Sequence, residues 1–231
     1  MSGFFLTLDG IDGAGKSTLL DGLCQWFRSQ KNRVVTHTRD PGGTSVGGEI
    51  RRLMLDSDLR IHPRTEATLF MASRSEMVAQ IIQPALDRGE VVISDRYLLS
   101  TVVYQSNAGL SRKDQDSDAA ANATSNLPLS TTDLWEIGRW AAGGRDPDLT
   151  LLLDLPADVS MRRLAGHPDR MEARGLEYMQ RVRQSFLCEV SRAGGAWKVL
   201  DATLTPEQLL VQAIQSVQEL IHSSSPLRDE S

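Results

Sequence analysis

The chain has 231 residues, of which 40% are hydrophobic, and its formal net charge is −5. This composition excludes wholesale disorder, argues against a nucleic-acid coat protein, and suits one α/β domain with a sizeable core. No apolar run approaches a membrane span, the first residues lack signal-peptide features, and Cys24 and Cys188 fit no metal-ligand spacing. We therefore expect a cytoplasmic protein with reduced cysteines that binds neither nucleic acid nor membrane.

Apolar runs alternate along the chain with segments of helical periodicity. The expected strands cover residues 4–8, 33–39, 90–96, 149–156 and 197–202. The expected helices cover residues 16–30, 45–56, 63–88, 98–107, 131–142, 157–165, 174–193 and 205–222. Strands that are apolar on both faces and separated by helices predict a three-layer α/β sandwich, with a five-stranded parallel sheet flanked by helices.

Two segments depart from this alternation. Residues 111–131 are polar, rich in small residues and long for a connection in a compact domain. A solvated surface insertion is favoured there over a functional lid, because the cost of loop closure grows slowly with length. The prediction is a single domain over residues 1–222, followed by a polar, flexible tail at 223–231.

The first strand leads directly into a glycine-rich turn with the spacing G-x-x-x-x-G-K-[ST]. Glycines let successive N–H groups turn toward phosphate oxygens, and the helix that follows adds its positive end. A turn without a ligand is the alternative, but the strand before it and the helix after it favour a nucleoside triphosphate. The residues expected to contact ATP phosphates are Gly10, Ile11, Asp12, Gly13, Ala14, Gly15, Lys16, Ser17 and Thr18, with Lys16 at the β/γ-phosphates and Ser17 on Mg²⁺.

GTPases and kinases are two classes of protein that carry such a turn. Residues 40–43 fit the D-x-x-G motif of GTPases. A GTPase is nevertheless disfavoured, because none of the four lysines lies in the guanine-reading motif [NT]-K-x-D. A kinase needs a second pocket that binds an anion. The segments "TRDPGGT" (38–44) and "ISDRY" (93–97) end two expected strands, and ligands of such sheets bind at the strand ends. Arg39 and Arg96 suit phosphate binding, with surface salt bridges as the alternative, and Asp95 suits a metal–water contact, with a buried ion pair as the alternative.

Several motifs together resemble the thymidylate kinase family. They are "GIDGAGKST", "RDPGGT", "LFMASR", "SDRYLLSTVVYQ", "PDLTLLLDLP", "DRME" and "VLDAT", and the resemblance runs through Leu220 apart from the insertion at 111–131. It implies the nucleoside monophosphate kinase fold, commonly as a homodimer. The implied reaction is transfer of the γ-phosphoryl group of ATP to dTMP, giving dTDP, with Mg²⁺ present.

The resemblance also assigns the residues that would bind dTMP. Arg39 and Arg96 would hold its phosphate. Phe70 would stack on thymine and Arg74 would bond the base, which is consistent with their spacing of four on a helix, although Phe70 could also be a core residue. Gln105 and Ser100 would line the base pocket. Tyr97 would crowd the ribose 2′ position, and Asp12 would meet the 3′-hydroxyl.

The resemblance places Asp9 near the metal and the phosphates, with Ser17 and Asp95. The alternative for Asp9 is a strand-end residue satisfied by backbone N–H groups. Ser106 stands where the family usually has glycine, so the geometry of that loop is open.

The source of a catalytic arginine is a second departure. Some family members carry a basic residue within the glycine-rich turn, where this chain has Gly13. The lid near residues 162–176 is short, and Arg163 and Arg170 match its basic positions, with Arg162 and Arg174 beside them. The hypothesis is that Arg170, with Arg163, joins Lys16 and Asp95 in the catalytic set when the lid closes. The alternative is that Arg170 pairs with Glu172 or Asp169 and only shapes the lid.

Two other functions stay in view. A kinase for another nucleoside monophosphate, or for a nucleoside, would prefer dCMP, UMP or thymidine to dTMP. A non-catalytic module would bind ATP and dTMP without forming dTDP.

Overall fold

A computed structural model describes residues 3–30, 33–55, 59, 61–107, 129–164 and 175–223. Its strands are β1 (Phe4–Asp9), β2 (Val35–Arg39), β3 (Val91–Asp95), β4 (Leu149–Asp154) and β5 (Ala196–Asp201). They form one five-stranded sheet in the order β2-β3-β1-β4-β5, and every neighbouring pair is parallel. The predicted α/β class and five-stranded parallel sheet are confirmed.

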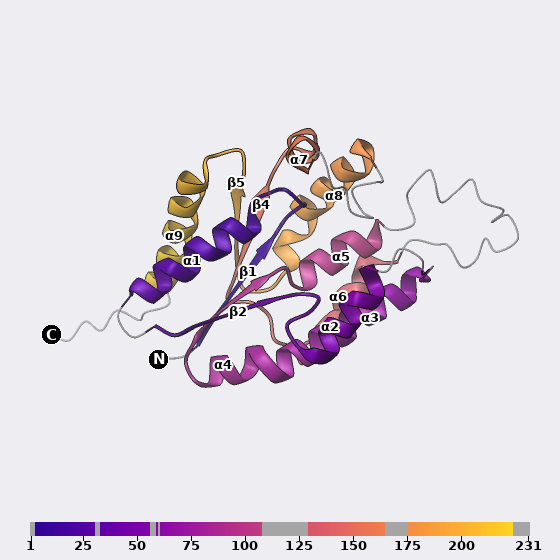
Figure 1. Ribbon diagram of the computed structural model, residues 1–231, viewed down its shortest axis with the longest axis horizontal. Helices are drawn as coiled ribbons and strands as arrows, with labels where there is room; N and C mark the ends of the chain where they lie inside the picture. The colour runs from indigo at the N-terminus through magenta and orange to yellow at the C-terminus, as the bar shows by residue number, and fades with distance from the viewer. Residues whose placement is uncertain are drawn as a thin grey trace, which may run out of the picture.

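Helices cover both faces of this sheet. They are α1 (Lys16–Ser29), α2 (Ser45–Leu55), α3 (Pro63–Met77), α4 (Gln83–Asp87), α5 (Leu98–Ser106), α6 (Thr131–Ala141), α7 (Ala157–Leu164), α8 (Leu176–Glu189) and α9 (Pro206–Ser223). In Figure 1, α1 and α9 lie together on one side of the sheet, while α5, α6 and α8 lie on the other. The helix α3 contacts α2, α5 and α6. None of the described helices has both the length and the hydropathy needed to span a membrane.

The expected helix at 63–88 is divided by a wide turn. A π-helical segment, Val78–Ile82, separates α3 from α4, and the N–H of Gln83 donates to the carbonyl of Val78, five residues back. The reason is Pro84, which has no N–H and whose ring would crowd the carbonyl four residues earlier in a regular α-helix. The wide turn accommodates this proline, so the helical segment stays continuous from α3 to α4.

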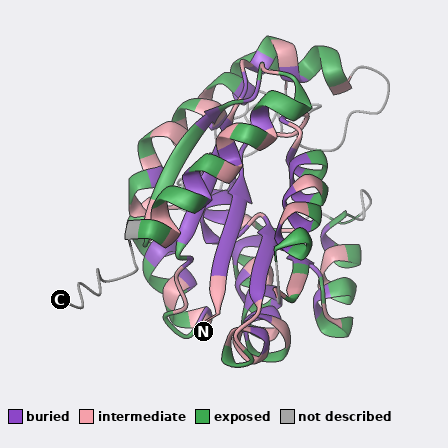
Figure 2. Ribbon diagram, turned by 90° about the vertical axis from the view of Figure 1, so that its left-hand side faces the viewer, coloured by how far each residue is buried: buried purple, intermediate pink, exposed green. Residues whose placement is uncertain are grey.

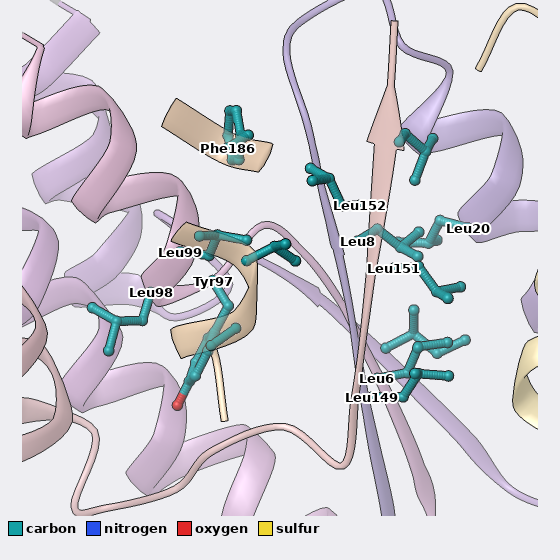
Figure 3. Close-up of a cluster of buried hydrophobic side chains, with 14 of the residues drawn as sticks. Leu6, Leu8, Leu20, Tyr97, Leu98, Leu99, Leu149, Leu151, Leu152 and Phe186 are labelled. Carbon is teal, nitrogen blue, oxygen red and sulfur yellow. The ribbon is translucent and has the colours of Figure 1, made fainter. Parts of the chain in front are cut away.

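The core lies between the sheet and its two helical layers. Figure 2 shows the central strands buried and the outward faces of the helices exposed. In Figure 3, Leu6 and Leu8 of β1 lie close to Leu149 of β4 and Leu20 of α1, and Leu6 is the register partner of Leu149. Burying one such leucine side chain contributes about 2 kcal/mol. The strands thus form a rigid platform for the loops at their carboxyl ends.

Several predicted segments lie partly or wholly outside the described residues. Of the insertion at 111–131, only 129–131 are described, and α6 begins at Thr131. The lid at 162–176 is described at 162–164 and 175–176, and the tail at 223–231 is described at Ser223 alone. The predicted domain boundaries therefore stay predictions.

Candidate active site

The glycine-rich turn between β1 and α1, residues 10–18, is called the P-loop below. Gly10 has φ +139°, and a Cβ there would lie 2.5 Å from the carbonyl oxygen of Leu153 on β4, so no larger residue fits. The ammonium of Lys16 donates to the carbonyls of Gly10 and Ile11 at 3.1 and 2.8 Å. The sequence prediction of a tight turn carrying a lysine at the carboxyl edge of the sheet is confirmed, and its ligand remains an expectation.

Burial and neighbouring charge tune the two ionisable groups of the P-loop. Burial of Lys16, and then the like charge of Arg96, lower its pKa to about 8, although nearby carboxylates act in the opposite direction. Burial raises the pKa of Asp12, but Arg96 and Lys16 outweigh this effect and lower it to about 2. Asp12 is therefore an ionised acceptor at neutral pH.

Two buried carboxylates at the ends of β1 and β3 are each only half satisfied. Oδ1 of Asp9 accepts a hydrogen bond from the hydroxyl of Ser100, and Oδ2 of Asp95 accepts from Nε of Arg39 at 3.1 Å. Within the described residues, Oδ2 of Asp9 and Oδ1 of Asp95 have no hydrogen-bond partner. Burial raises the pKa of Asp9, and Ser100 and nearby cations oppose that rise. Buried carboxylate oxygens without partners are a feature that a hydrated cation can satisfy.

Arg96 joins the P-loop to α5. Its guanidinium donates to the carbonyl of Gly10 and the hydroxyl of Ser100, both at 3.0 Å, and to Oδ1 of Asp12 at 2.5 Å. It also lies over the ring of Tyr104, 5.2 Å from the centroid. Arg96 has φ +69°, in the left-handed region that side-chain-bearing residues rarely adopt. The strained backbone is thus that of Arg96, the arginine predicted to bind a phosphate.

A pocket between α2, α3, α5 and the P-loop, the arginine pocket, gathers these groups. Its lining includes three cationic residues (Arg39, Arg51 and Arg96), three acidic residues (Asp12, Asp40 and Glu66) and the uncharged residues Phe70, Thr101 and Tyr104. Ser100 also lines it, so the predicted residues Asp12, Arg39, Phe70, Arg96 and Ser100 are brought together. Positive charge beside an aromatic wall suits an organic anion with a planar ring.

Sequence reasoning missed Arg51, Thr101 and Tyr104. The signal for Tyr104 was available, because it lies four residues after Ser100 and so shares its face of α5. The signal for Arg51 was weaker, since it is one of two adjacent arginines on α2. Burial, and then the like charge of Arg39, lower the pKa of Arg51, which places it within the same cationic group.

The resemblance implies a place beside the ribose for Tyr97, but Tyr97 does not line the pocket. It is 2% exposed, its hydroxyl donates to the carbonyl of Arg145 at 2.8 Å, and its ring meets Phe5 edge-on at 5.1 Å. Tyr97 is the cap residue before α5, and its ring packs against Phe5 of β1. The tyrosine that faces the pocket is Tyr104.

Arg74 and Gln105 are also absent from the pocket lining. The side chain of Arg74 is 0% exposed because it is drawn into an ion pair with Asp40. Gln105 is 1% exposed, and neither atom of its amide has a hydrogen-bond partner among the described residues. Direct contact of these two residues with a base stays a prediction.

The helix α7 packs onto the P-loop at Gly13. With φ +73°, a Cβ at Gly13 would lie 3.3 Å from both the carbonyl of Ser160 and Cγ of Leu164, so α7 leaves little room for a side chain. From the same helix, Arg163 donates to the carbonyl of Gly13 at 3.0 Å. An arginine from α7 therefore reaches the P-loop at Gly13. Arg170 and Arg174 lie outside the described residues, and Arg162 pairs with Asp158 at the surface.

A second pocket, the leucine pocket, opens on the other side of the P-loop. Its apolar lining includes Leu19, Leu204, Pro206 and Leu209, with Thr18 and Arg163 at its edge. Such a surface can cover the flat, apolar ring of a nucleotide base.

Comparison with known proteins gives one consistent result. The family model for thymidylate kinase matches residues 8–214, from β1 into α9. The chain is 49% identical to a thymidylate kinase of Rhodopirellula baltica, over 90% of this chain and 77% of that protein. It is 38% identical to one of Cupriavidus necator (88% and 92% covered) and 36% identical to one of Bifidobacterium longum (95% and 100% covered).

Proposed function

The chain belongs to the thymidylate kinase family, and from that premise we propose that it transfers the γ-phosphoryl group of ATP to dTMP, giving dTDP and ADP. The observation that carries the proposal is the arginine pocket beside Lys16. It offers cationic groups for a phosphate and an aromatic wall for a base, next to a triphosphate-binding turn.

The acceptor phosphate binds to Arg39, Arg51 and Arg96. Planar guanidinium groups bind phosphate oxygens in pairs, and three of them around one pocket offset the charge of a monophosphate. Asp12 is ionised and pairs with Arg96, so it accepts a hydrogen bond from the 3′-hydroxyl.

The thymine ring stacks on Phe70, whose side chain lines the pocket. Thr101 meets the edge of the base, with Arg74 and Gln105 behind it. Tyr104 crowds the ribose 2′ position and so disfavours ribonucleotides. The proposal thus gives Tyr104 the role that the family resemblance implied for Tyr97.

The donor phosphates bind to the N–H groups of residues 10–18, with Lys16 at the β- and γ-phosphates, and the donor base enters the leucine pocket. Mg²⁺ would be held by Ser17, Asp95 and Asp9. The oxygens of Asp9 and Asp95 that lack a hydrogen-bond partner support this placement. When bound, the cation offsets the charge on the triphosphate oxygens.

Because the acceptor phosphate is itself the nucleophile, the reaction needs no strong general base. The protein holds the two nucleotides in line, and Lys16 and the arginines offset the charge of the transferring group. When the lid at 162–176 closes and excludes water, Arg163 and Arg170 add positive charge beside the transferring phosphoryl group. The position of Arg163 beside Gly13 supports its part in this step.

Proton uptake on ATP binding tests the tuned lysine. At pH 8 about half of Lys16 is neutral, and a triphosphate beside it favours the charged form, so ATP binding should draw a proton from the buffer. Isothermal titration calorimetry with Mg·ATP at pH 8 in HEPES and in Tris should give different apparent enthalpies, and this difference should shrink at pH 7, where most of Lys16 is already charged. Equal enthalpies in both buffers at pH 8 would contradict the lowered pKa.

The chain also forms a homodimer, through a surface on α3 and α6. Thr65, Thr68 and Ala72 are exposed on one face of α3, and Ile137 and Trp140 of α6 are 54% and 83% exposed. These two helices contact each other, and small residues beside large apolar ones allow two copies to approach closely.

Trp140→Glu should turn the dimer into a monomer, because it places a charge in an apolar contact. Size-exclusion chromatography with light scattering should halve the measured mass. Trp197→Glu on β5, where the tryptophan is 42% exposed, is the matched control and should stay dimeric. A dimeric Trp140→Glu protein would move the interface elsewhere.

The proposed activity is tested by ADP release with Mg·ATP and, in parallel, dTMP, dUMP, UMP, dCMP or thymidine. Clear preference for dTMP is the expected result. Preference for another acceptor would show a different kinase, and ATP binding without any turnover would show a non-catalytic module.

A further inference from the structure

Asp40 is a buried carboxylate that the reaction above does not use. It follows Arg39 at the end of β2, its side chain is 0% exposed, and it lies against the arginine pocket. Oδ2 of Asp40 accepts a hydrogen bond from Nε of Arg74 at 2.7 Å and lies 2.6 Å from Nη2, across 34 positions of sequence. A fully buried ion pair is costly to assemble and is therefore weak evidence of a stabilising role.

The pair continues to the pocket wall. Nη2 of Arg74 also donates to the hydroxyl oxygen of Thr101 at 2.6 Å, and the guanidinium lies 5.3 Å from the ring centroid of Tyr97. A guanidinium has donors and no acceptor, so the oxygen of Thr101 is the acceptor in this bond. The position of the Thr101 hydroxyl, which lines the pocket, therefore depends on where Asp40 holds Arg74.

The same carboxylate fixes the aromatic wall. Phe70 lies four residues before Arg74 on α3, so both project from one face of that helix. The loop after Asp40 is tied to α3 a second time, because the N–H of Gly42 donates to the hydroxyl of Ser73 at 3.2 Å. Through these two links, the loop that carries Arg39 and the helix that carries Phe70 hold one relative position.

We propose that Asp40 is a positioning residue for the base of the acceptor nucleotide, since it holds Arg74 and thereby places Thr101 and Phe70. This inference rests on the proposed function, because it takes the arginine pocket as the dTMP site. It predicts that Asp40 governs affinity and base selectivity for the acceptor and leaves the donor site unaffected. A role in stability alone would affect both substrates together.

The test compares Asp40→Asn and Asp40→Glu with the unaltered enzyme, with Asp21→Asn on the exposed face of α1 as the matched control. Asp40→Asn should raise the KM for dTMP about tenfold and reduce the preference for dTMP over dCMP by a similar factor. The KM for ATP should change less than about twofold, since the P-loop contacts are kept. Asp40→Glu keeps the charge and should restore part of both losses.

KM does not depend on the fraction of the sample that is folded. It can therefore be measured even if Asp40→Asn folds poorly. Equal rises in the KM for ATP and for dTMP would overturn the proposal, as would an unchanged preference for dTMP over dCMP. Failure of both Asp40 variants to fold would also overturn it, by assigning the carboxylate to stability. Lack of dTMP turnover in the unaltered enzyme would instead contradict the proposed function itself.

Discussion

Lys16→Met is expected to lower kcat by at least about a hundredfold, the scale on which the loss of one charge-stabilising group affects such reactions. The ammonium of Lys16 lies against the P-loop carbonyls, at the place where β- and γ-phosphates would bind. Methionine has a similar length and no charge, so the variant keeps the packing and removes only the cation. Steady-state ADP release with saturating ATP and dTMP measures the effect.

Although Lys16→Met should lose activity, its thermal stability should not fall. Burial lowers the pKa of Lys16 from 10.5 to about 8, so its charge disfavours the folded state below pH 8 and this penalty is relieved as the pH rises from about 8 toward 10.5. The midpoint of thermal unfolding at pH 7 should therefore be unchanged or raised in Lys16→Met. Lys198→Met is the control, because Lys198 pairs with Glu219 at the surface and should keep full activity. A Lys16→Met enzyme within tenfold of normal turnover would contradict the assigned role.

Arg96→Ala is expected to lower kcat/KM for dTMP by about a hundredfold or more, with a raised KM for dTMP and a smaller change for ATP. Arg96 is both a proposed phosphate ligand and the group that holds Asp12 and Ser100. Removing it leaves the carboxylate of Asp12 without its closest cation. The variant therefore disturbs the acceptor phosphate and the P-loop together.

The left-handed backbone at Arg96 offers a control for strain. Alanine keeps the strain of φ +69°, whereas glycine relieves about 1 kcal/mol of it. Arg96→Gly should thus unfold at a higher temperature than Arg96→Ala and show the same loss of activity. Arg28→Ala, at an exposed position of α1, should retain normal kinetics. If Arg96→Gly recovers activity, the loss belongs to the backbone and the guanidinium is not the phosphate ligand.

Local chemistry explains what could be predicted at this site. The P-loop depends on glycines, a lysine and a serine within eight positions, and the strand before it and the helix after it are visible as periodicity. The ends of β2 and β3 bring Arg39 and Arg96 to one edge of the sheet, because parallel strands share a direction. The spacing of four between Phe70 and Arg74 also placed both on one face of α3.

Orientation within the pocket could not be predicted in the same way. Tyr97 and Tyr104 stand seven positions apart, and which of them faces the pocket depends on where α5 begins and how it packs on β1 and α8. Arg74 shares a helical face with Phe70, but its guanidinium is buried behind the lining because it pairs with a carboxylate 34 positions earlier. Position 13 has little room for a side chain because α7 covers it. The contact comes from Ser160, which lies 147 positions later in the chain.

The sequence by itself determined the fold class, the triphosphate-binding turn and the arginines at the strand ends, since each follows from short-range pattern and residue chemistry. Only the tertiary structure decided that Arg51, Thr101 and Tyr104 line the pocket, that Tyr97 and Arg74 lie outside its lining, and that Arg163 reaches the P-loop. The physical reason is that side-chain direction is set by packing and by buried ion pairs between distant segments, and neither leaves a periodic signal in the chain.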